Sequence, residues 1–211
     1  MVVKNIFNII MNFIKRIKKA FGIFNHYYVK LNPSQFGYFG DRAAIGAPAD
    51  LKCPKNIYMY EHARIGRRAT IMTMGDSKFI MKRESEAAEG LVVVTSNHKQ
   101  DVGGFRVSGN DDNIYRDIII EEDVWLGINV TLLAGAHIGR GAICGAGCVI
   151  RKEIPPYAVV VGNPARIIKF KYSIDDIIRH EEALYSPEER IPREVLVKNY
   201  ENFLENKEKL F

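Results

Sequence analysis

One histidine occupies a place in the sequence where it could act as a base. The chain has five histidines: His26, His62, His98, His137 and His180. Only His98 opens a long, polar, glycine-rich stretch, which covers residues 95–117. Imidazole is neutral near pH 7 and takes a proton from a hydroxyl group, so His98 is a candidate general base. The residues alone leave open which group orients it: Asn97, Asp101, Glu121, Glu122 or Asp123.

A six-residue repeat surrounds this polar stretch. From residue 118 to 150 a large aliphatic residue, or a cysteine, recurs at every sixth position, and a smaller or branched residue stands two places before it. The recurring residues are Ile120, Leu126, Leu132, Ile138, Cys144 and Ile150. Apolar residues recur every 3.6 positions in an amphipathic helix and every two in an alternating strand, so neither accounts for the spacing. The pattern predicts short strands and turns that stack into a solenoid, with both residues of each doublet inside.

The repeat also covers the first half of the chain. Between residues 43 and 93 the same doublets occur less regularly, which brings their number to fourteen. At three doublets per turn, the sequence predicts about four to five coils. A solenoid tolerates the excursion at 95–117 because only its two ends must stay in register, and long loops on rigid scaffolds often carry function.

The string VWLGINVTLLAGAHIGRGAICGAGCVIRKEIPPYAVVVGNPARIIK resembles the C-terminal half of the hexapeptide-repeat acetyltransferases. The repeat, the tryptophan of VWLG, the GAG corner and the exit sequence VGNPAR carry the likeness, which covers residues 43–170. It is strongest for the branch of sugar O-acetyltransferases, which includes capsule- and lipopolysaccharide-modifying members. The resemblance implies an all-β core that folds as a left-handed parallel β-helix. In the family the excursion loop reaches the next subunit of a homotrimer and helps to form the active site.

The resemblance also implies an activity. It predicts an acetyl-CoA-dependent O-acetyltransferase that moves an acetyl group to a hydroxyl of a sugar or surface-polysaccharide precursor. Acetyl-CoA is already activated, so direct attack by the hydroxyl needs only a base, an oxyanion donor and good positioning. The resemblance assigns His98 as that base, and the mechanism requires no metal.

Family positions for the cofactor carry over onto five residues of this sequence: Ala146, Arg151, Lys152, Arg166 and Lys169. The small side chain of Ala146 leaves room for pantetheine, and Lys152, Arg166 and Lys169 offer positive charge to the CoA phosphates.

Trp125 is the only tryptophan, and the repeat directs it outward. It is expected either to form a flat wall beside the pantetheine or the acceptor, with Asn97 and Asp101 on the acceptor side, or to cover a seam between subunits. Two departures from the family affect this region. Ile128 stands where many relatives have a small polar residue, and the segment MTMGDSKF lacks an asparagine that some relatives place near the acetyl group.

Two segments flank the predicted solenoid. Residues 1–42 comprise a basic amphipathic helix, at 1–24, and a linker, and residues 171–211 form helices that cap the open end. The helix at 1–24 is expected either to lie on anionic lipid or to pack on the prism or a neighbouring subunit. We identify no cleavable signal peptide and no long apolar run, so we expect a cytoplasmic protein, with the inner face of the membrane as its second location.

Other functions remain as alternatives. On the same scaffold the acceptor could be an antibiotic or other xenobiotic, or the amine of an amino sugar. In another class, the chain could be a non-catalytic or zinc-dependent β-helix, but zinc would need three converging histidines and His98 stands alone in its loop. The net charge of +5 is not gathered in a basic stripe interleaved with aromatic residues, so we expect no nucleic-acid partner.

The three cysteines, Cys53, Cys144 and Cys148, show no CxxC spacing. Two of them fall on inward positions of the repeat, so buried free thiols in a reducing compartment are expected.

Overall fold

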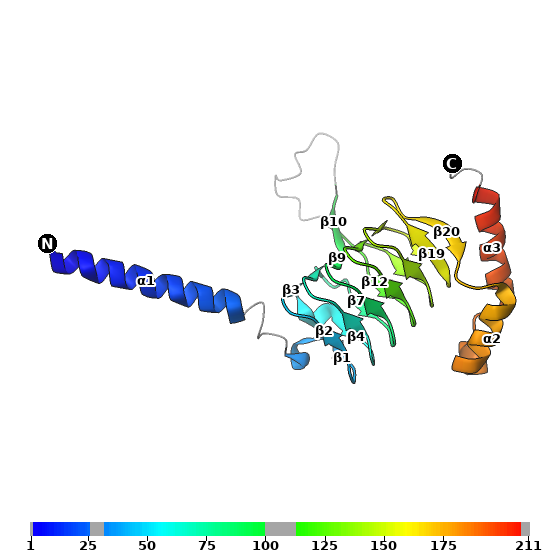
Figure 1. Cartoon of the computed structure of the whole chain (residues 1–211), viewed down its shortest axis with the longest axis horizontal. Helices are drawn as coiled ribbons and strands as arrows, with labels where there is room; N and C mark the ends of the chain where they lie inside the picture. Colours follow the sequence, from blue (N-terminus) through cyan, green and yellow to red (C-terminus); the bar gives the residue numbers. More distant parts are fainter. Residues whose placement is uncertain (1, 26–31, 100–112, 208–211) are drawn as a thin grey trace.

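The chain folds around a parallel β-solenoid with three flat sides. The structure is a computed structural model that describes residues 2–25, 32–99 and 113–207. Each complete coil contributes one short strand to each of three sheets, and the coils stack along one axis (Figure 1). The stacking agrees with the repeat, since equivalent doublets of successive coils pair in parallel, such as Leu126 with Cys144.

The three sheets are named A, B and C in the order in which each coil visits them. Sheet A contains β1 (Tyr38–Phe39), β4 (Ile57–Met59), β7 (Phe79–Met81), β12 (Ile118–Ile120), β15 (His137–Ile138) and β18 (Glu153–Ile154). Sheet B contains β2 (Ala44–Ile45), β5 (Arg64–Ile65), β8 (Glu86–Ala87), β13 (Trp125–Leu126), β16 (Ile143–Cys144), β19 (Ala158–Val161) and β20 (Arg166–Phe170). Sheet C contains β3 (Asp50–Lys52), β6 (Thr70–Met72), β9 (Val92–Val94), β14 (Thr131–Leu133) and β17 (Val149–Ile150).

The solenoid is longer than the predicted four to five coils. Five coils have a strand in all three sheets, and a sixth has strands only in sheets A and B, which gives about six turns. The doublet count missed β1, β18 and β19, because their inward residues do not continue the six-residue spacing. Ile154 and Val160 are nevertheless buried and extend the same core.

The interior is a narrow apolar column built from the inward doublets. Twenty-eight buried apolar residues, from Ile45 to Val160, form one continuous cluster. Cys144 and Cys148 are buried free thiols, as predicted, whereas Cys53 is exposed on a turn. Burial raises the pKa of the Cys144 thiol, so this group stays protonated and serves as core.

The helices lie outside this column. α1 (Val2–Phe24) precedes the solenoid, and α2 (Ile174–Leu184) and α3 (Arg193–Lys207) follow it. Short 3₁₀ turns occupy Pro33–Gln35, Pro54–Asn56 and Pro187–Glu189. Ile177 of α2 and Leu196 of α3 pack with Tyr157 of the last coil in a second, smaller cluster, so these helices cover that end of the solenoid. Within the described part of the chain, no helix is long and apolar enough to cross a membrane.

Candidate functional site

His98 lies on a hairpin that leaves the edge between sheets C and A. β10 (Ser96–His98) pairs antiparallel with β11 (Asn113–Tyr115), and His98 stands opposite Asn113. Residues 100–112 join the two strands and lie outside the described residues, and the predicted acceptor residue Asp101 is among them. The solenoid repeat ends at β9 and resumes at β12, so the hairpin is the base of the predicted excursion.

A buried hydroxyl network fixes the base of this hairpin. Thr95, which directly precedes β10, is fully buried, and its Oγ1 accepts hydrogen bonds from Ser77 Oγ at 2.6 Å and from Met74 N at 3.1 Å. The returning strand is held by a bond from Lys78 N to Asp117 Oδ1 at 2.8 Å. Each buried polar group therefore has a partner, which is the condition for a rigid polar cluster. The six-residue repeat did not predict the anchoring role of Ser77 and Thr95, because isolated hydroxyl residues in a turn resemble ordinary surface residues.

The turn at residues 73–78 packs closely beneath the hairpin. Gly75 has a φ of +58°, and a Cβ at this position would lie 3.2 Å from the ring of Tyr115. Asp76, Ser77, Tyr115 and Asp117 line a hollow of about 340 Å³ here. This turn belongs to the segment MTMGDSKF, and Asp76 is one of its polar side chains at the hollow.

The sequence left open which acid orients His98, and the structure places several candidates elsewhere. Asn97 Oδ1 accepts the backbone N–H of His98 at 2.9 Å, and none of the described side chains hydrogen-bonds to the imidazole ring. Glu121 bonds instead to His137 Nε2 at 2.9 Å and to Lys82 Nζ at 2.6 Å. These contacts lie at the edge between sheets A and B, one edge away from the hairpin.

Trp125 lies on the outer face of sheet B, with 58% of its surface exposed. In register with it stand Ile143 of β16 and Val159 of β19, and Val159 pairs with Lys169 of β20. Trp125 and Lys169 therefore belong to one outward column, three strand spacings or about 14 Å apart. The outward position predicted for Trp125 is confirmed.

Ala146 occupies the turn between sheets B and C. A Cβ on Gly127 would lie 2.7 Å from Ala146 N, so the backbones of successive coils are in close contact at this corner. Ala146 is exposed, and Ile128, in the turn that follows Gly127, is 44% exposed. The corner thus presents a thin, apolar ridge.

Lys152 and Arg166 meet at the end of the solenoid. They line one groove of about 440 Å³ together with Ala165, Asn199, Asn202 and Phe203. The last three residues come from α3, which the sequence predicted only as a cap. Arg151 precedes Lys152 and is exposed on the edge between sheets C and A, two coils beyond the hairpin.

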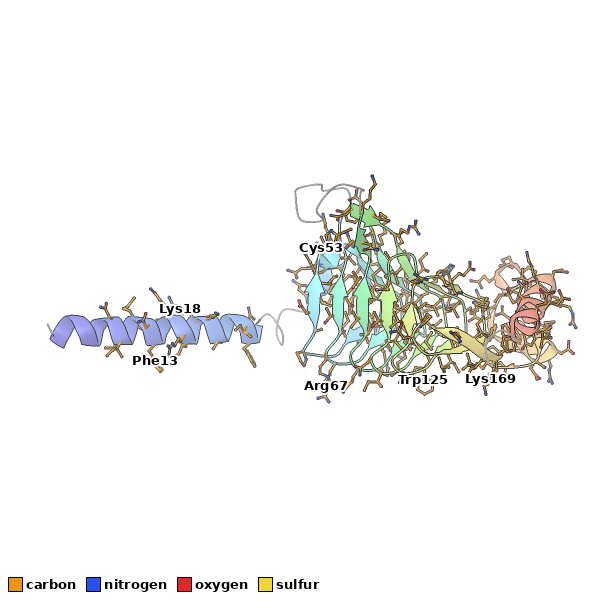
Figure 2. All side chains as sticks on the ribbon, turned by 90° about the horizontal axis from the view of Figure 1, so that it is seen from above. Phe13, Lys18, Cys53, Arg67, Trp125 and Lys169 are labelled. Carbon is orange, nitrogen blue, oxygen red and sulfur yellow. The ribbon has the colours of Figure 1, made fainter. Side chains whose placement is uncertain are left out.

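Five of the candidate residues fall into two separate groups on one chain. The hairpin group comprises Asn97 and His98, while Trp125, Ala146 and Lys169 lie on or beside sheet B. Figure 2 shows Cys53, which occupies the same edge as the hairpin, on the opposite side of the solenoid from Trp125 and Lys169. A single chain does not bring the two groups together.

The geometry offers no site for zinc among the described residues, where no group of three or more metal-binding side chains occurs. His62 is instead paired with Glu84 at 2.7 Å. His137 is likewise engaged with Glu121.

Comparison with known proteins locates the repeat in a family. The family described as "Bacterial transferase hexapeptide (six repeats)" matches residues 117–152. The chain carries the hexapeptide repeat of bacterial transferases. A 2,3,4,5-tetrahydropyridine-2,6-dicarboxylate N-acetyltransferase of Staphylococcus aureus is 42% identical over 59 residues, which are 28% of this chain and 25% of that protein. The chain thus spans about a quarter of the length of this relative.

Solved hexapeptide-repeat structures share the fold more widely. A hexapeptide-repeat acetyltransferase of Vibrio cholerae O1 biovar eltor, complexed with acetyl-CoA, superposes with a TM-score of 0.60 at 25% identity, covering 66% of this chain and 74% of that one. A maltose O-acetyltransferase of Clostridium difficile 630 superposes with a TM-score of 0.62 at 23% identity, covering 75% and 86%. The predicted β-helix and its membership among hexapeptide-repeat folds are confirmed.

Proposed function

We propose that the protein is an acetyl-CoA-dependent O-acetyltransferase that acts on a sugar hydroxyl, with His98 as general base. The observation that carries the proposal is the position of His98, on a hairpin anchored by buried hydroxyls and projecting from a hexapeptide-repeat solenoid. A histidine that served only the fold would not need to stand exposed on such an excursion.

The division of the candidate residues favours a shared site. A homotrimer of three-sided solenoids would set the hairpin edge of one subunit against sheet B of the next. In a closed ring of three subunits, every hairpin edge would then meet a neighbouring sheet B. His98 of one subunit would then meet Trp125 and Ala146 of its neighbour. The 58% exposure of Trp125 in the single chain is consistent with a side chain that another surface covers.

The residues fit the proposed co-substrate. Lys152 and Arg166 place two positive charges beside Glu153 in the groove next to α3, and this net positive charge suits the CoA phosphates. The apolar ridge at Ala146 and Ile128 suits the thin pantetheine arm. Bound acetyl-CoA supplies an activated acetyl thioester.

The catalytic step that the protein would perform is a proton transfer. His98 takes the proton of the acceptor hydroxyl as its oxygen bonds to the acetyl carbon, and returns it to the sulfur as the carbon–sulfur bond breaks. The products are the acetyl ester and free CoA thiol. A positioned base of this kind contributes roughly 10²- to 10⁴-fold in rate.

The hollow beneath the hairpin is the proposed acceptor subsite. Asp76 and Asp117 offer carboxylates that accept hydrogen bonds from sugar hydroxyls, and Tyr115 offers a ring that packs on the face of a sugar. A precursor of a surface polysaccharide is the acceptor proposed for this open hollow. Acetylation of an amine is the second candidate, because the partial relative from Staphylococcus aureus is named as an N-acetyltransferase.

The first test measures release of free CoA thiol from acetyl-CoA against a panel of sugars, glycan precursors, amino sugars and antibiotics. We expect turnover with one class of acceptor, reduced roughly 10²- to 10⁴-fold in His98→Ala. The matched control is His62→Ala, which removes a half-buried histidine that is paired with Glu84 outside the proposed site, and this variant should keep full turnover.

The same assay can reject the proposal. Turnover in His98→Ala at the wild-type rate would show that His98 is not the general base. Absence of turnover with every acceptor, together with absence of CoA binding by calorimetry, would favour a non-catalytic solenoid.

A further inference from the structure

α1 exposes its apolar side chains along its length. Phe13 is 62% exposed and Phe21 is 70% exposed. Among the described side chains of α1, the other exposed large apolar residues are Ile9, Ile10, Met11, Ile14, Ile17, Ile23 and Phe24. The helix extends away from the solenoid (Figure 1), so these side chains do not contribute to the apolar column. An exposed apolar surface of this size indicates a surface that binds something.

The charges of α1 have one sign. Its 23 residues include no Asp or Glu, and Lys15, Arg16, Lys18 and Lys19 are all exposed. At 100° per residue these basic residues fall on the side opposite the arc that contains Phe13, Ile17, Phe21 and Phe24. Figure 2 shows Phe13 and Lys18 projecting from opposite sides of the helix.

We propose that α1 lies in the plane of a membrane surface that carries anionic lipid. The apolar side would enter the boundary of the acyl chains while the lysines and Arg16 contact the headgroups. The described part of α1 is not apolar enough to cross the bilayer. This contact does not depend on the proposed acetyl transfer, although it would hold the chain close to acceptors carried on lipid.

A second copy of the chain is the competing occupant. Ile10, Phe13, Ile17, Ala20 and Phe24 follow the alternating three- and four-residue spacing of a coiled coil. However, the positions that follow Phe13 and Ala20 are Ile14 and Phe21, where coiled coils carry charged residues that pair between helices. With no acidic residue on α1, copies of the helix would bring like charges together, whereas an anionic surface complements them.

Flotation of the full-length protein with lipid vesicles tests the proposal. One set of vesicles is pure phosphatidylcholine and the other contains phosphatidylserine as well. Binding should require phosphatidylserine and weaken with added salt, since exposed charges are screened. Phe13→Ser/Phe21→Ser, which leaves the charge unchanged, should weaken binding at least about tenfold. Lys15→Glu/Lys19→Glu should do the same by charge.

The matched control changes the same number of charges on the rest of the chain. Lys55→Glu/Lys198→Glu alters two exposed lysines outside α1 and should bind as the wild type does. Unchanged thermal unfolding in every variant shows that the solenoid stays folded.

Three outcomes would overturn the proposal. They are absence of vesicle binding, equal binding to both lipid compositions, and a loss of oligomeric mass in Phe13→Ser/Phe21→Ser with vesicle binding unchanged. The last would assign the apolar face to a second copy. None of these measurements involves acetyl transfer, so they test the membrane contact independently of the proposed function.

Discussion

At the scale of single residues, Glu121 is held in its charged form by two neighbours. Burial alone would raise the pKa of its carboxyl, but hydrogen bonds from His137 and Lys82 outweigh burial and lower the pKa to about 2. In return, the bond to Glu121 raises the pKa of His137 despite partial burial. The ion pairs of Glu121 with Lys82 and His137 therefore connect β7, β12 and β15 of three successive coils.

This coupling predicts a pH dependence of stability. The contribution of Glu121 is present above its ordinary pKa of 4.5 and is lost as the pH falls toward about 2. The contribution of protonated His137 is present below its ordinary pKa of 6.5 and is lost as the pH rises through the raised value. The network should thus stabilise the protein most between these two ordinary values.

The measurement compares urea unfolding of the wild type and His137→Gln at about pH 3, 5.5 and 8. The difference in free energy of unfolding should be largest at the middle pH, and below about 1 kcal/mol because the pair is partly solvated. A difference that grows steadily with pH would contradict the assignment.

At the scale of elements, one carboxylate joins the C-terminal helices to the last coils. Glu181 of α2 is 2% exposed. It hydrogen-bonds to Tyr157 Oη of the solenoid, to Arg140 Nη1 at 2.8 Å and to the backbone N–H of Ile191 at 3.1 Å. Burial and the Glu181 carboxylate both raise the pKa of Tyr157, so its hydroxyl remains a donor.

Removing this carboxylate should release α2. In Glu181→Ala the partly buried guanidinium of Arg140 would keep Glu122 as an anionic partner, so the loss should stay below the roughly 3–5 kcal/mol that leaving a buried charge unpaired costs. We expect faster hydrogen exchange in α2 and a lower urea midpoint. Glu182→Ala changes the exposed neighbour and serves as the control. Unfolding that matches the wild type in Glu181→Ala would show that apolar packing alone holds the helix.

At the scale of the whole molecule, the division of the site between two sides of the solenoid predicts a trimer with shared sites. Light scattering should give about 72 kDa, three times the chain mass of 24.0 kDa. A monomer mass in solution would contradict the shared site directly.

Mixed oligomers test which residues meet across the interface. His98→Ala and Trp125→Ala should each have strongly reduced turnover alone. After unfolding and refolding together in equal amounts, about a quarter of the sites should combine an intact hairpin with an intact neighbouring sheet B. Recovery of turnover would establish that the two groups act between subunits. If turnover stays absent although mixed oligomers form, the two groups belong to one chain or Trp125 acts elsewhere.

The sequence by itself determined the solenoid, because apolar residues six positions apart can all face inward only in stacked coils of short strands and turns. It also identified His98 and the outward Trp125 as candidate site residues. It predicted four to five coils where the structure has about six, because Ile154 follows Ile150 after only four residues and so breaks the repeat. The tertiary structure alone decided that Ser77 and Thr95 anchor the hairpin and that Asn199 and Phe203 face Lys152. Such contacts join residues far apart in the chain, so no local spacing records them. The separation of His98 from Trp125 on opposite sides of one solenoid was likewise decided in three dimensions, because the path of each coil sets which edge a residue reaches.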